Sequence, residues 1–182
     1  MNRSVYLIRH ATPDWSRVDL PYHLPPGPAL TEQGINEAQG LGDFLSREGV
    51  RILFCSPLER CLATARIVSG ISGAEIFVNS RLKEWQPGED ATTIRNRVRP
   101  IFKEASLITD WKGAVGLVTH GGPIAMLMRS LGMQEEELLK NRIFDRGNPL
   151  PPAGVWRADK SPDAQAWTLD FVYNPNGDAG RR

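Results

Sequence analysis

The chain contains few of the features that mark secreted, membrane-bound or nucleic-acid-binding proteins. It has only two cysteines, Cys55 and Cys61, which we expect to be small buried residues without a disulfide framework. Its 22 Lys and Arg residues nearly balance its 21 Asp and Glu residues, so no overall field attracts it to nucleic acid or membranes. No apolar run approaches the roughly 18 residues of a membrane span, and we expect residues 1–4 to lead into a strand rather than a signal peptide. We therefore expect a reduced, cytoplasmic protein whose anion site, if it has one, is local.

Several well-known catalytic motifs are also absent. The three histidines, His10, His23 and His120, do not have the spacing of a metal site, so we expect no metal. The paired glycines 121 and 122 are not followed by the Lys-Ser/Thr of a nucleotide-binding P-loop. The chain also lacks the G-x-S-x-G elbow of many serine hydrolases.

Short apolar runs alternate with helical patterns along the chain. Strands are predicted over residues 5–8, 51–55, 75–78, 114–119, 155–157 and 166–173. Helices are predicted from Thr31 to Gly49, from Pro57 to Gly70, from Thr92 or Thr93 to Ala105, from Ile124 to Leu131 and from Glu135 to Lys140. This alternation is typical of a three-layer α/β sandwich with a mainly parallel central sheet flanked by helices. We expect one domain over residues 1–173 and a disordered tail over residues 174–182.

Two helices carry specific expectations. In the first, Ile35, Ala38 and Leu41 recur at helical spacing and are predicted to face the sheet. In the third, Pro100 lies inside the apolar pattern and should kink or split the helix, because proline cannot donate the helical hydrogen bond.

Residues that can bind an anion follow three of the predicted strands. They are Arg9 and His10, then Ser56 and Arg60, then His120 with Gly121 and Gly122. Because the carboxyl ends of parallel strands share one edge of a sheet, these residues are expected to converge. Arginine donates two hydrogen bonds in a planar fork, and backbone N–H groups at a helix start add further donors. The predicted pocket is therefore suited to a phosphoryl group.

Five segments carry a resemblance to a known family. They are Leu7-Ile8-Arg9-His10-Ala11-Thr12, Leu30-Thr31-Glu32-Gln33-Gly34, Ser56 to Ala65, Leu82-Lys83-Glu84, and Val118-Thr119-His120-Gly121-Gly122. In the same order, they resemble motifs of the histidine phosphatase superfamily, in its phosphoglycerate mutase-like branch. These motifs are an Arg-His-Gly signature, a Leu-Thr-x-x-Gly helix start, a Ser-x-Leu-x-Arg-x-x-x-Thr-Ala block, an acid-bearing segment and a second histidine.

The resemblance implies a metal-independent and cofactor-independent phosphatase that hydrolyses a small phosphomonoester through a phosphohistidine. His10 would be the nucleophile, neutral and with its other ring nitrogen hydrogen-bonded to a backbone carbonyl. Arg9, Arg60 and His120 would bind the non-bridging oxygens and stabilise the charge of the transition state. Glu84 would protonate the leaving oxygen, a role that favours a raised pKa.

The chain departs from the family pattern at several places near His10. Ala11 replaces the usual glycine, and Ser16 stands where the family often has asparagine. Ser16, Thr12 and the backbone of Gly121 are further candidates for phosphate binding. Another branch of the family has an aspartate at the position of Gly121, so its absence here assigns the acid role to Glu84.

Two alternatives to a phosphatase stay open on the sequence. One is a mutase that transfers the phosphoryl group as a phosphoglycerate mutase does, and the other is a phospho-ligand binding module without activity. The short segment between Glu84 and Ile101 leaves little room for the cover that a mutase needs over its phosphohistidine. Arg95, Arg97 and Arg99 could bind a substrate carboxylate, but we expect them to form a solvated helix face.

The expected partner is a small phosphorylated substrate, with no nucleic acid and no membrane, and the chain is compatible with a homodimer. The aromatic loop from Trp15 to Tyr22, together with His23 and Trp85, is expected to wall the substrate site. These residues do not distinguish a sugar phosphate from a nucleotide or a phosphoprotein.

Overall fold

The protein is described by a computed structural model that covers residues 3–177, except for the side chains of residues 110–112 and 146. The strands are β1 (Arg3–Arg9), β2 (Ile52–Cys55), β3 (Glu75–Val78), β4 (Val115–Thr119), β5 (Val155–Lys160) and β6 (Thr168–Tyr173). The helices are α1 (Glu32–Arg47), α2 (Glu59–Ser72), α3 (Ala91–Lys112), α4 (Gly121–Ser130) and α5 (Glu135–Asn141), with short 3-10 helices η1 (Ser80–Leu82) and η2 (Asp145–Gly147). None of the helices in this part of the chain is both long and apolar enough to cross a membrane.

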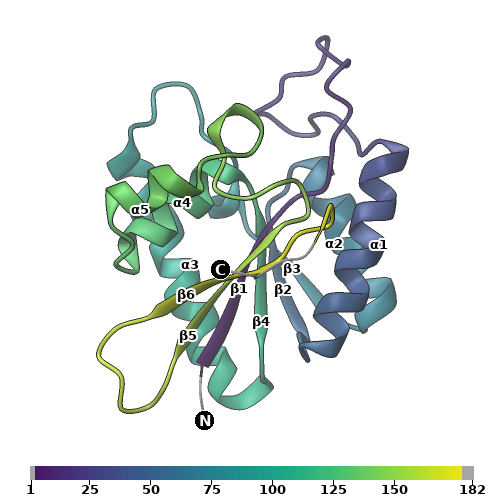
Figure 1. Ribbon diagram of the computed structural model, residues 1–182. Coiled ribbons are helices and arrows are strands. Elements are labelled where there is room, and N and C mark those ends of the chain that lie inside the picture. Colours follow the sequence, from purple (N-terminus) through teal and green to yellow (C-terminus); the bar gives the residue numbers. More distant parts are fainter. Residues whose placement is uncertain (1–2, 178–182) are drawn as a thin grey trace.

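The strands form one mixed sheet in the order β3-β2-β4-β1-β5-β6 (Figure 1). β3, β2, β4 and β1 are parallel, whereas β5 pairs antiparallel with β1, and β6 pairs antiparallel with β5. The predicted α/β class with a mainly parallel sheet is therefore confirmed. β2 and β4 are buried along their whole length, which explains why their sequences are almost continuously apolar.

Helices cover both faces of the sheet (Figure 1). Side chains alternate between the two faces along β1, so Val5 and Leu7 pack in the core under α3 and α4. Tyr6 and Ile8 pack in the second core, under α1 and α2. This arrangement leaves the carboxyl ends of β1, β2 and β4 at one edge, and the loops that follow them can meet there.

The structure corrects details of two predicted helices. Ile35 is 41% exposed, and the buried face of α1 is formed instead by residues that include Glu37 and Ala38. α3 is continuous through Pro100 and is not split, and its N-cap is Asp90, whose carboxylate accepts a hydrogen bond from the backbone N–H of Thr93. An aspartate accepts this bond as well as a threonine does, so the sequence pattern misplaced the cap.

The predicted domain boundary falls at the end of β6. Residues 174–177 form a turn after Tyr173, in which the backbone N–H of Gly177 donates to the carbonyl of Asn174. Residues 178–182, the remainder of the predicted tail, lie outside the described residues. The division into one domain and a tail stays a prediction.

Candidate active site

Backbone hydrogen bonds tie the first residues of the loops after β1 and β2 to the end of β4. The N–H of His10 donates to the carbonyl of Thr119 at 3.0 Å, and the N–H of Ser56 donates to that of Val118 at 3.0 Å. The Thr119 hydroxyl also donates to the carbonyl of Leu82 at 2.6 Å, which ties the segment before Glu84 to the end of β4. β4 lies between β1 and β2 in the sheet, so it brings both loops to one place. The rings of His10 and His120 consequently lie 5.2 Å apart, centre to centre.

His10 is fully buried and is held in one tautomer. Its Nδ1 lies 2.8 Å from the carbonyl oxygen of Ala11, and because a carbonyl only accepts, Nδ1 carries the proton. Nε2 therefore carries the lone pair, and it accepts a hydrogen bond from the hydroxyl of Tyr22 at 3.3 Å. Burial, followed by the charges of Arg60 and Arg9, lowers the pKa of His10 well below its ordinary value. The ring is neutral at pH 7, with Nε2 able to act as a nucleophile.

Arg60 and His120 form a second buried unit beside His10. Nη2 of Arg60 lies 3.2 Å from Nδ1 of His120, and Nε2 of His120 lies 2.9 Å from the hydroxyl of Ser56. Arginine can only donate, so Nδ1 accepts and Nε2 carries the proton. Burial and then the charge of Arg60 lower the pKa of His120 well below its ordinary value. The cluster thus contains two neutral imidazoles next to a buried guanidinium.

The guanidinium of Arg60 is held from two sides by Tyr22. Nη1 donates to the Tyr22 carbonyl at 2.8 Å, and the central carbon lies 3.8 Å from the centre of the Tyr22 ring, in cation–π geometry. The loop that carries Tyr22 is further ordered by stacking of Trp15 on the Tyr22 ring, with centres 5.0 Å apart. Nε of Arg60 is buried and has no hydrogen-bond partner among the described residues.

Arg9 is nearly as buried as Arg60 and pairs with a carboxylate that the sequence patterns did not predict. Its Nη1 and Nη2 each lie 2.8 Å from one oxygen of Asp145, and Nη1 also donates to the carbonyl of Leu150 at 3.0 Å. Nε of Arg9 is another buried donor without a partner in the described part of the chain. Buried N–H groups without partners are rare in proteins. Two of them on neighbouring arginines indicate a place for an anion.

Glu84 faces this cluster from the segment between η1 and α3. Its Oε2 lies 3.9 Å from Nδ1 of His120, and its Oε1 accepts a hydrogen bond from the N–H of Trp85 at 2.8 Å. The side chain is only 17% exposed. Burial raises the pKa of Glu84 above its ordinary value, against the opposing effects of the Trp85 N–H and of nearby arginines. A carboxyl group that keeps its proton to higher pH can act as a general acid.

Arg97 holds the segment that carries Glu84. Its guanidinium donates to the carbonyls of Arg81, Lys83 and Glu84 at 2.7 to 3.0 Å, and pairs with both carboxylate oxygens of Glu89. The expectation of a solvated arginine face on this helix is therefore wrong for Arg97, although the arginines at 95 and 99 are exposed. Spacing along the helix did not reveal this role, because the partners are carbonyls of a distant loop.

Known proteins resemble this chain in sequence and in fold. The family model of the histidine phosphatase superfamily (branch 1) matches residues 5–89. The phosphoserine phosphatase 1 of Hydrogenobacter thermophilus is 26% identical over 161 residues, which cover 70% of this chain and 75% of that protein. The 2,3-bisphosphoglycerate-dependent phosphoglycerate mutase of Beijerinckia indica is 37% identical over 127 residues, which cover 67% of this chain and 60% of that protein. The chain belongs to the histidine phosphatase superfamily.

A solved structure supports the fold of this family member. The phosphoglycerate mutase of Bacillus anthracis superposes with a TM-score of 0.76 over 96% of this chain and 94% of that one. At 15% identity, this likeness concerns the fold and not the reaction. The residues that the family model matches include His10, Arg60 and Glu84, whereas His120 lies beyond the match.

The two glycines after His120 are required by close packing. A side chain at Gly121 would place Cβ 1.6 Å from Oδ1 of Asn148, and one at Gly122 would place it 2.9 Å from Oε1 of Glu84. α4 begins at Gly121, so the helix start lies directly against the loop of Asn148 and against Glu84. The glycines therefore let the acid approach the helix start closely.

Thr12 and Ser16, both predicted to bind phosphate, have other partners in this structure. The hydroxyl of Thr12 donates to Glu37 at 2.9 Å, and that of Ser16 donates to Asp14 at 2.6 Å. A hydroxyl has one hydrogen, so neither can donate to a phosphate while these bonds persist. Their phosphate contacts stay predictions, as does that of Gly121.

Ser56 was already a candidate because it directly follows a strand, whereas Asp145 and Thr64 were not singled out from the sequence. Ser56 binds His120, Asp145 pairs with Arg9, and Thr64 accepts from the N–H of Ala11 at 3.0 Å while donating to the carbonyl of Arg60 at 2.7 Å. Ser56 and Thr64 lie inside the Ser-x-Leu-x-Arg-x-x-x-Thr-Ala block, so that motif was an available signal. No motif pointed to Asp145.

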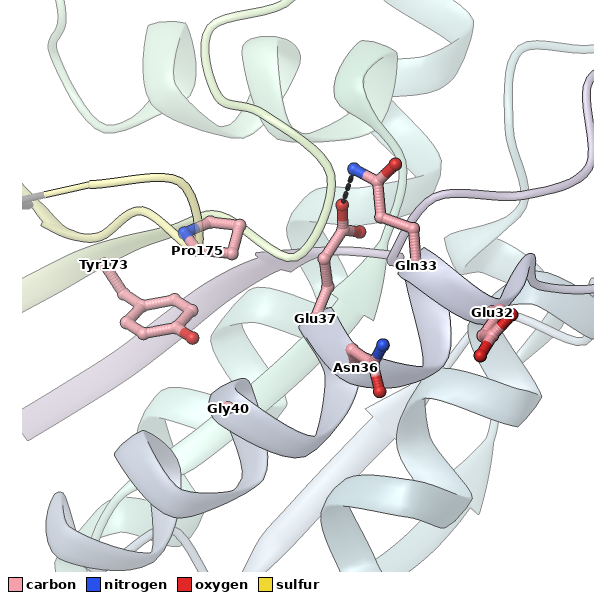
Figure 2. A pocket seen from close by; sticks show the side chains of 7 residues that line it. All are labelled: Glu32, Gln33, Asn36, Glu37, Gly40, Tyr173 and Pro175. Carbon is pink, nitrogen blue, oxygen red and sulfur yellow. Dashed lines mark hydrogen bonds between the residues drawn. The ribbon is translucent and has the colours of Figure 1, made fainter.

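A separate pocket lies between α1 and the residues that end β6 (Figure 2). It is lined by Glu32, Gln33, Asn36, Glu37, Gly40, Tyr173 and Pro175, and by none of the residues that surround His10. Glu37 connects the two regions, since it accepts hydrogen bonds from Gln33, drawn in Figure 2, and from Thr12. Among the side chains that the structure describes, no three of His, Cys, Asp or Glu gather as a metal site would require.

The predicted state of the cysteines is confirmed. Cys55 and Cys61 are free and buried. Burial raises the pKa of Cys61 to about 12, so its thiol is not a nucleophile at pH 7.

Proposed function

We propose that the chain is a metal-independent phosphatase that hydrolyses a small phosphomonoester through a phosphohistidine on His10. One observation carries the proposal: a neutral His10 beside two buried arginines, Arg9 and Arg60, each with an Nε–H that lacks an acceptor in the described structure. A buried polar group without a partner costs roughly 1–3 kcal/mol. The non-bridging oxygens of a phosphoryl group would supply the missing acceptors.

In the first step, the lone pair on Nε2 of His10 attacks phosphorus and a P–N bond forms. The P–O bond to the leaving group breaks, and Glu84 transfers its proton to the departing oxygen. The ring of His10 becomes cationic, and its Nδ1–H strengthens the hydrogen bond to the Ala11 carbonyl. The hydroxyl of Tyr22, which lies 3.3 Å from Nε2 in the free protein, must give way to phosphorus.

In the second step, Glu84 as a carboxylate takes a proton from water, whose oxygen attacks phosphorus. The P–N bond breaks, its electron pair returns to Nε2, and His10 is neutral again. Arg9 and Arg60 stabilise the charge on the phosphoryl oxygens in both steps. His120 carries its proton on Nε2, so it donates to phosphate through Nδ1 only after a second protonation, which a bound dianion favours.

A phosphatase is favoured over a mutase by the segment beside the acid. Only Trp85 to Asp90 separate Glu84 from α3, which leaves no extra segment there to exclude water from a phosphohistidine. Relatives with names of both kinds exist, so the assay must distinguish the two activities directly. The cytoplasmic location and the small phosphorylated substrate belong to the proposal.

The test uses labelled phosphate on the protein. The wild type, His10→Ala and His23→Ala are incubated with a labelled phosphomonoester and quenched in alkali, which preserves phosphohistidine. A later treatment with acid cleaves phosphohistidine and releases its label. We expect acid-labile label on the wild type and on His23→Ala, and none on His10→Ala. Equal turnover by His10→Ala and by the wild type would rule out His10 as the nucleophile.

Two further arms separate the alternatives. Conversion of 3-phosphoglycerate to 2-phosphoglycerate at a rate above hydrolysis would identify a mutase. Tight binding of orthophosphate by a protein without turnover would identify a binding module.

A further inference from the structure

The donors of Arg9 are divided between two edges of its guanidinium. The end edge is formed by Nη1 and Nη2, and the side edge by Nε and Nη2. Arg97 shows the side edge in use, with Nε and Nη2 at 2.7 and 2.8 Å from the oxygens of Glu89. Arg9 instead presents its end edge to Asp145. This leaves the side edge, with its unpartnered Nε–H, for another anion.

We infer that Asp145 is a positioning residue that fixes Arg9 so that its side edge binds the phosphoryl oxygens. The inference rests on the proposed function and deepens it. An arginine held at its end cannot rotate away from the site, and the two donors of its side edge match two oxygens of a phosphoryl group. The carboxylate also neutralises part of the buried charge of Arg9 when no substrate is bound.

The loop that carries Asp145 is attached to the site strand. This loop runs from α5 to β5 and passes beside the end of β1 (Figure 1). The N–H of Arg9 donates to the Gly154 carbonyl at 3.1 Å, and the N–H of Ala153 donates to the His10 carbonyl at 3.1 Å. Within the loop, the side chain of Asn148 donates to the carbonyl of Asp145 at 2.6 Å. These backbone attachments favour a fixed support over a carboxylate that leaves when substrate arrives.

A support and a competitor predict opposite effects of removing the carboxylate. If Asp145 supports Arg9, its loss frees the guanidinium to turn and weakens phosphate binding. If Asp145 competes with phosphate for Arg9, its loss removes a repelling charge and strengthens binding.

The experiment compares Asp145→Ala and Asp145→Asn with wild type and with Glu135→Gln. The control removes the carboxylate of the Arg129–Glu135 pair, which lies on α4 and α5 away from His10. We measure the Kd of orthophosphate by calorimetry, its inhibition constant against p-nitrophenyl phosphate, and kcat and KM. We expect the Kd and the inhibition constant to rise about tenfold in both Asp145 variants, equivalent to about 1.4 kcal/mol, and to stay unchanged in Glu135→Gln.

A double variant tests whether the effect passes through Arg9. Asp145→Ala added to Arg9→Lys should weaken orthophosphate binding no further than Arg9→Lys alone, because both act on one contact. A general structural defect would instead add to the loss. Asp145→Asn keeps one acceptor for Arg9, so its Kd for orthophosphate can still be measured if Asp145→Ala does not fold.

The outcomes separate this inference from the proposed function. Unchanged or tighter orthophosphate binding in the Asp145 variants would overturn the positioning role while leaving the phosphatase intact. Wild-type protein that binds orthophosphate without turnover would overturn the catalytic proposal, and the Kd series would still decide the role of Asp145. Wild-type protein that does not bind orthophosphate would overturn both.

Discussion

Replacing Arg97 by lysine should slow the reaction through Glu84 without touching the phosphate-binding residues. All five N–H donors of Arg97 are used in this structure, on three carbonyls and on both oxygens of Glu89. A lysine offers three donors and no planar fork, so at least two of the five bonds are lost. Each bond contributes about 1 kcal/mol, so the interaction between residue 97 and the segment of Glu84 becomes weaker by about 2 kcal/mol.

The expected result depends on the leaving group. Misplacing a catalytic group by about 1 Å can cost about 100-fold in rate, and the role of Glu84 is to protonate the leaving oxygen. We therefore expect kcat for an alkyl phosphate to fall by about 10- to 100-fold in Arg97→Lys. The fall for p-nitrophenyl phosphate should be much smaller, because nitrophenolate leaves without a proton.

The assay measures kcat and KM for both substrates in wild type, Arg97→Lys and Arg95→Lys. Arg95 lies on the same helix but is exposed, so its replacement should leave kcat and KM unchanged for both substrates. Equal losses for the two substrates would refute the link between Arg97 and proton transfer. A loss of the same size in Arg95→Lys would refute the role of Arg97 altogether.

Three further predictions concern pH and packing. Because burial raises the pKa of Glu84 above 4.5, the folded protein binds an extra proton in the window between the two values and its stability falls as the pH rises through that window. Glu84→Gln should thus be more stable than wild type above the raised pKa but almost inactive on alkyl phosphates; equal urea midpoints at pH 8 would contradict this. Because the pKa of His10 is lowered below 6.5, the unfolded chain binds a proton that the folded chain does not, and stability falls as the pH drops from 6.5 towards the lowered value. His10→Gln should reduce this dependence by up to about 1.4 kcal/mol per pH unit, and an unchanged slope in urea unfolding at pH 7.5 and 5.5 would count against a neutral buried ring. Gly121→Ala should lower stability by about 1–3 kcal/mol, because its Cβ meets Oδ1 of Asn148 at 1.6 Å, whereas Gly70→Ala, with no atom within 4 Å of its Cβ, should not; thermal unfolding compares the two.

The site shows where sequence patterns were informative. His10, Arg60 and His120 could be identified because each lies directly after a strand or in the first turn of the following helix. Strand order then brings such positions to one edge of a parallel sheet. Local structure places each of these residues at the end of its own strand, so short motifs record them.

The partners of these residues could not be read in the same way. Arg97 was expected to be solvated and instead binds the segment of Glu84, and Ile35 was expected to be buried and is exposed. In both cases, periodicity predicted the helix correctly. It did not predict which side chains of the helix face the core, or which loops pack against the helix. That depends on contacts with loops far away in the sequence.

The α/β class, the family and the candidate residues at the sheet edge could be read from the sequence. These follow from apolar periodicity and from motifs whose spacing is fixed within single strands and helices. The protonation of His10, the pairing of Arg9 with Asp145 and the support of Glu84 by Arg97 became visible in the folded chain alone. The physical reason is that pKa values and hydrogen-bond partners depend on burial and on distances between side chains. The fold sets these distances between residues as far apart as Arg9 and Asp145.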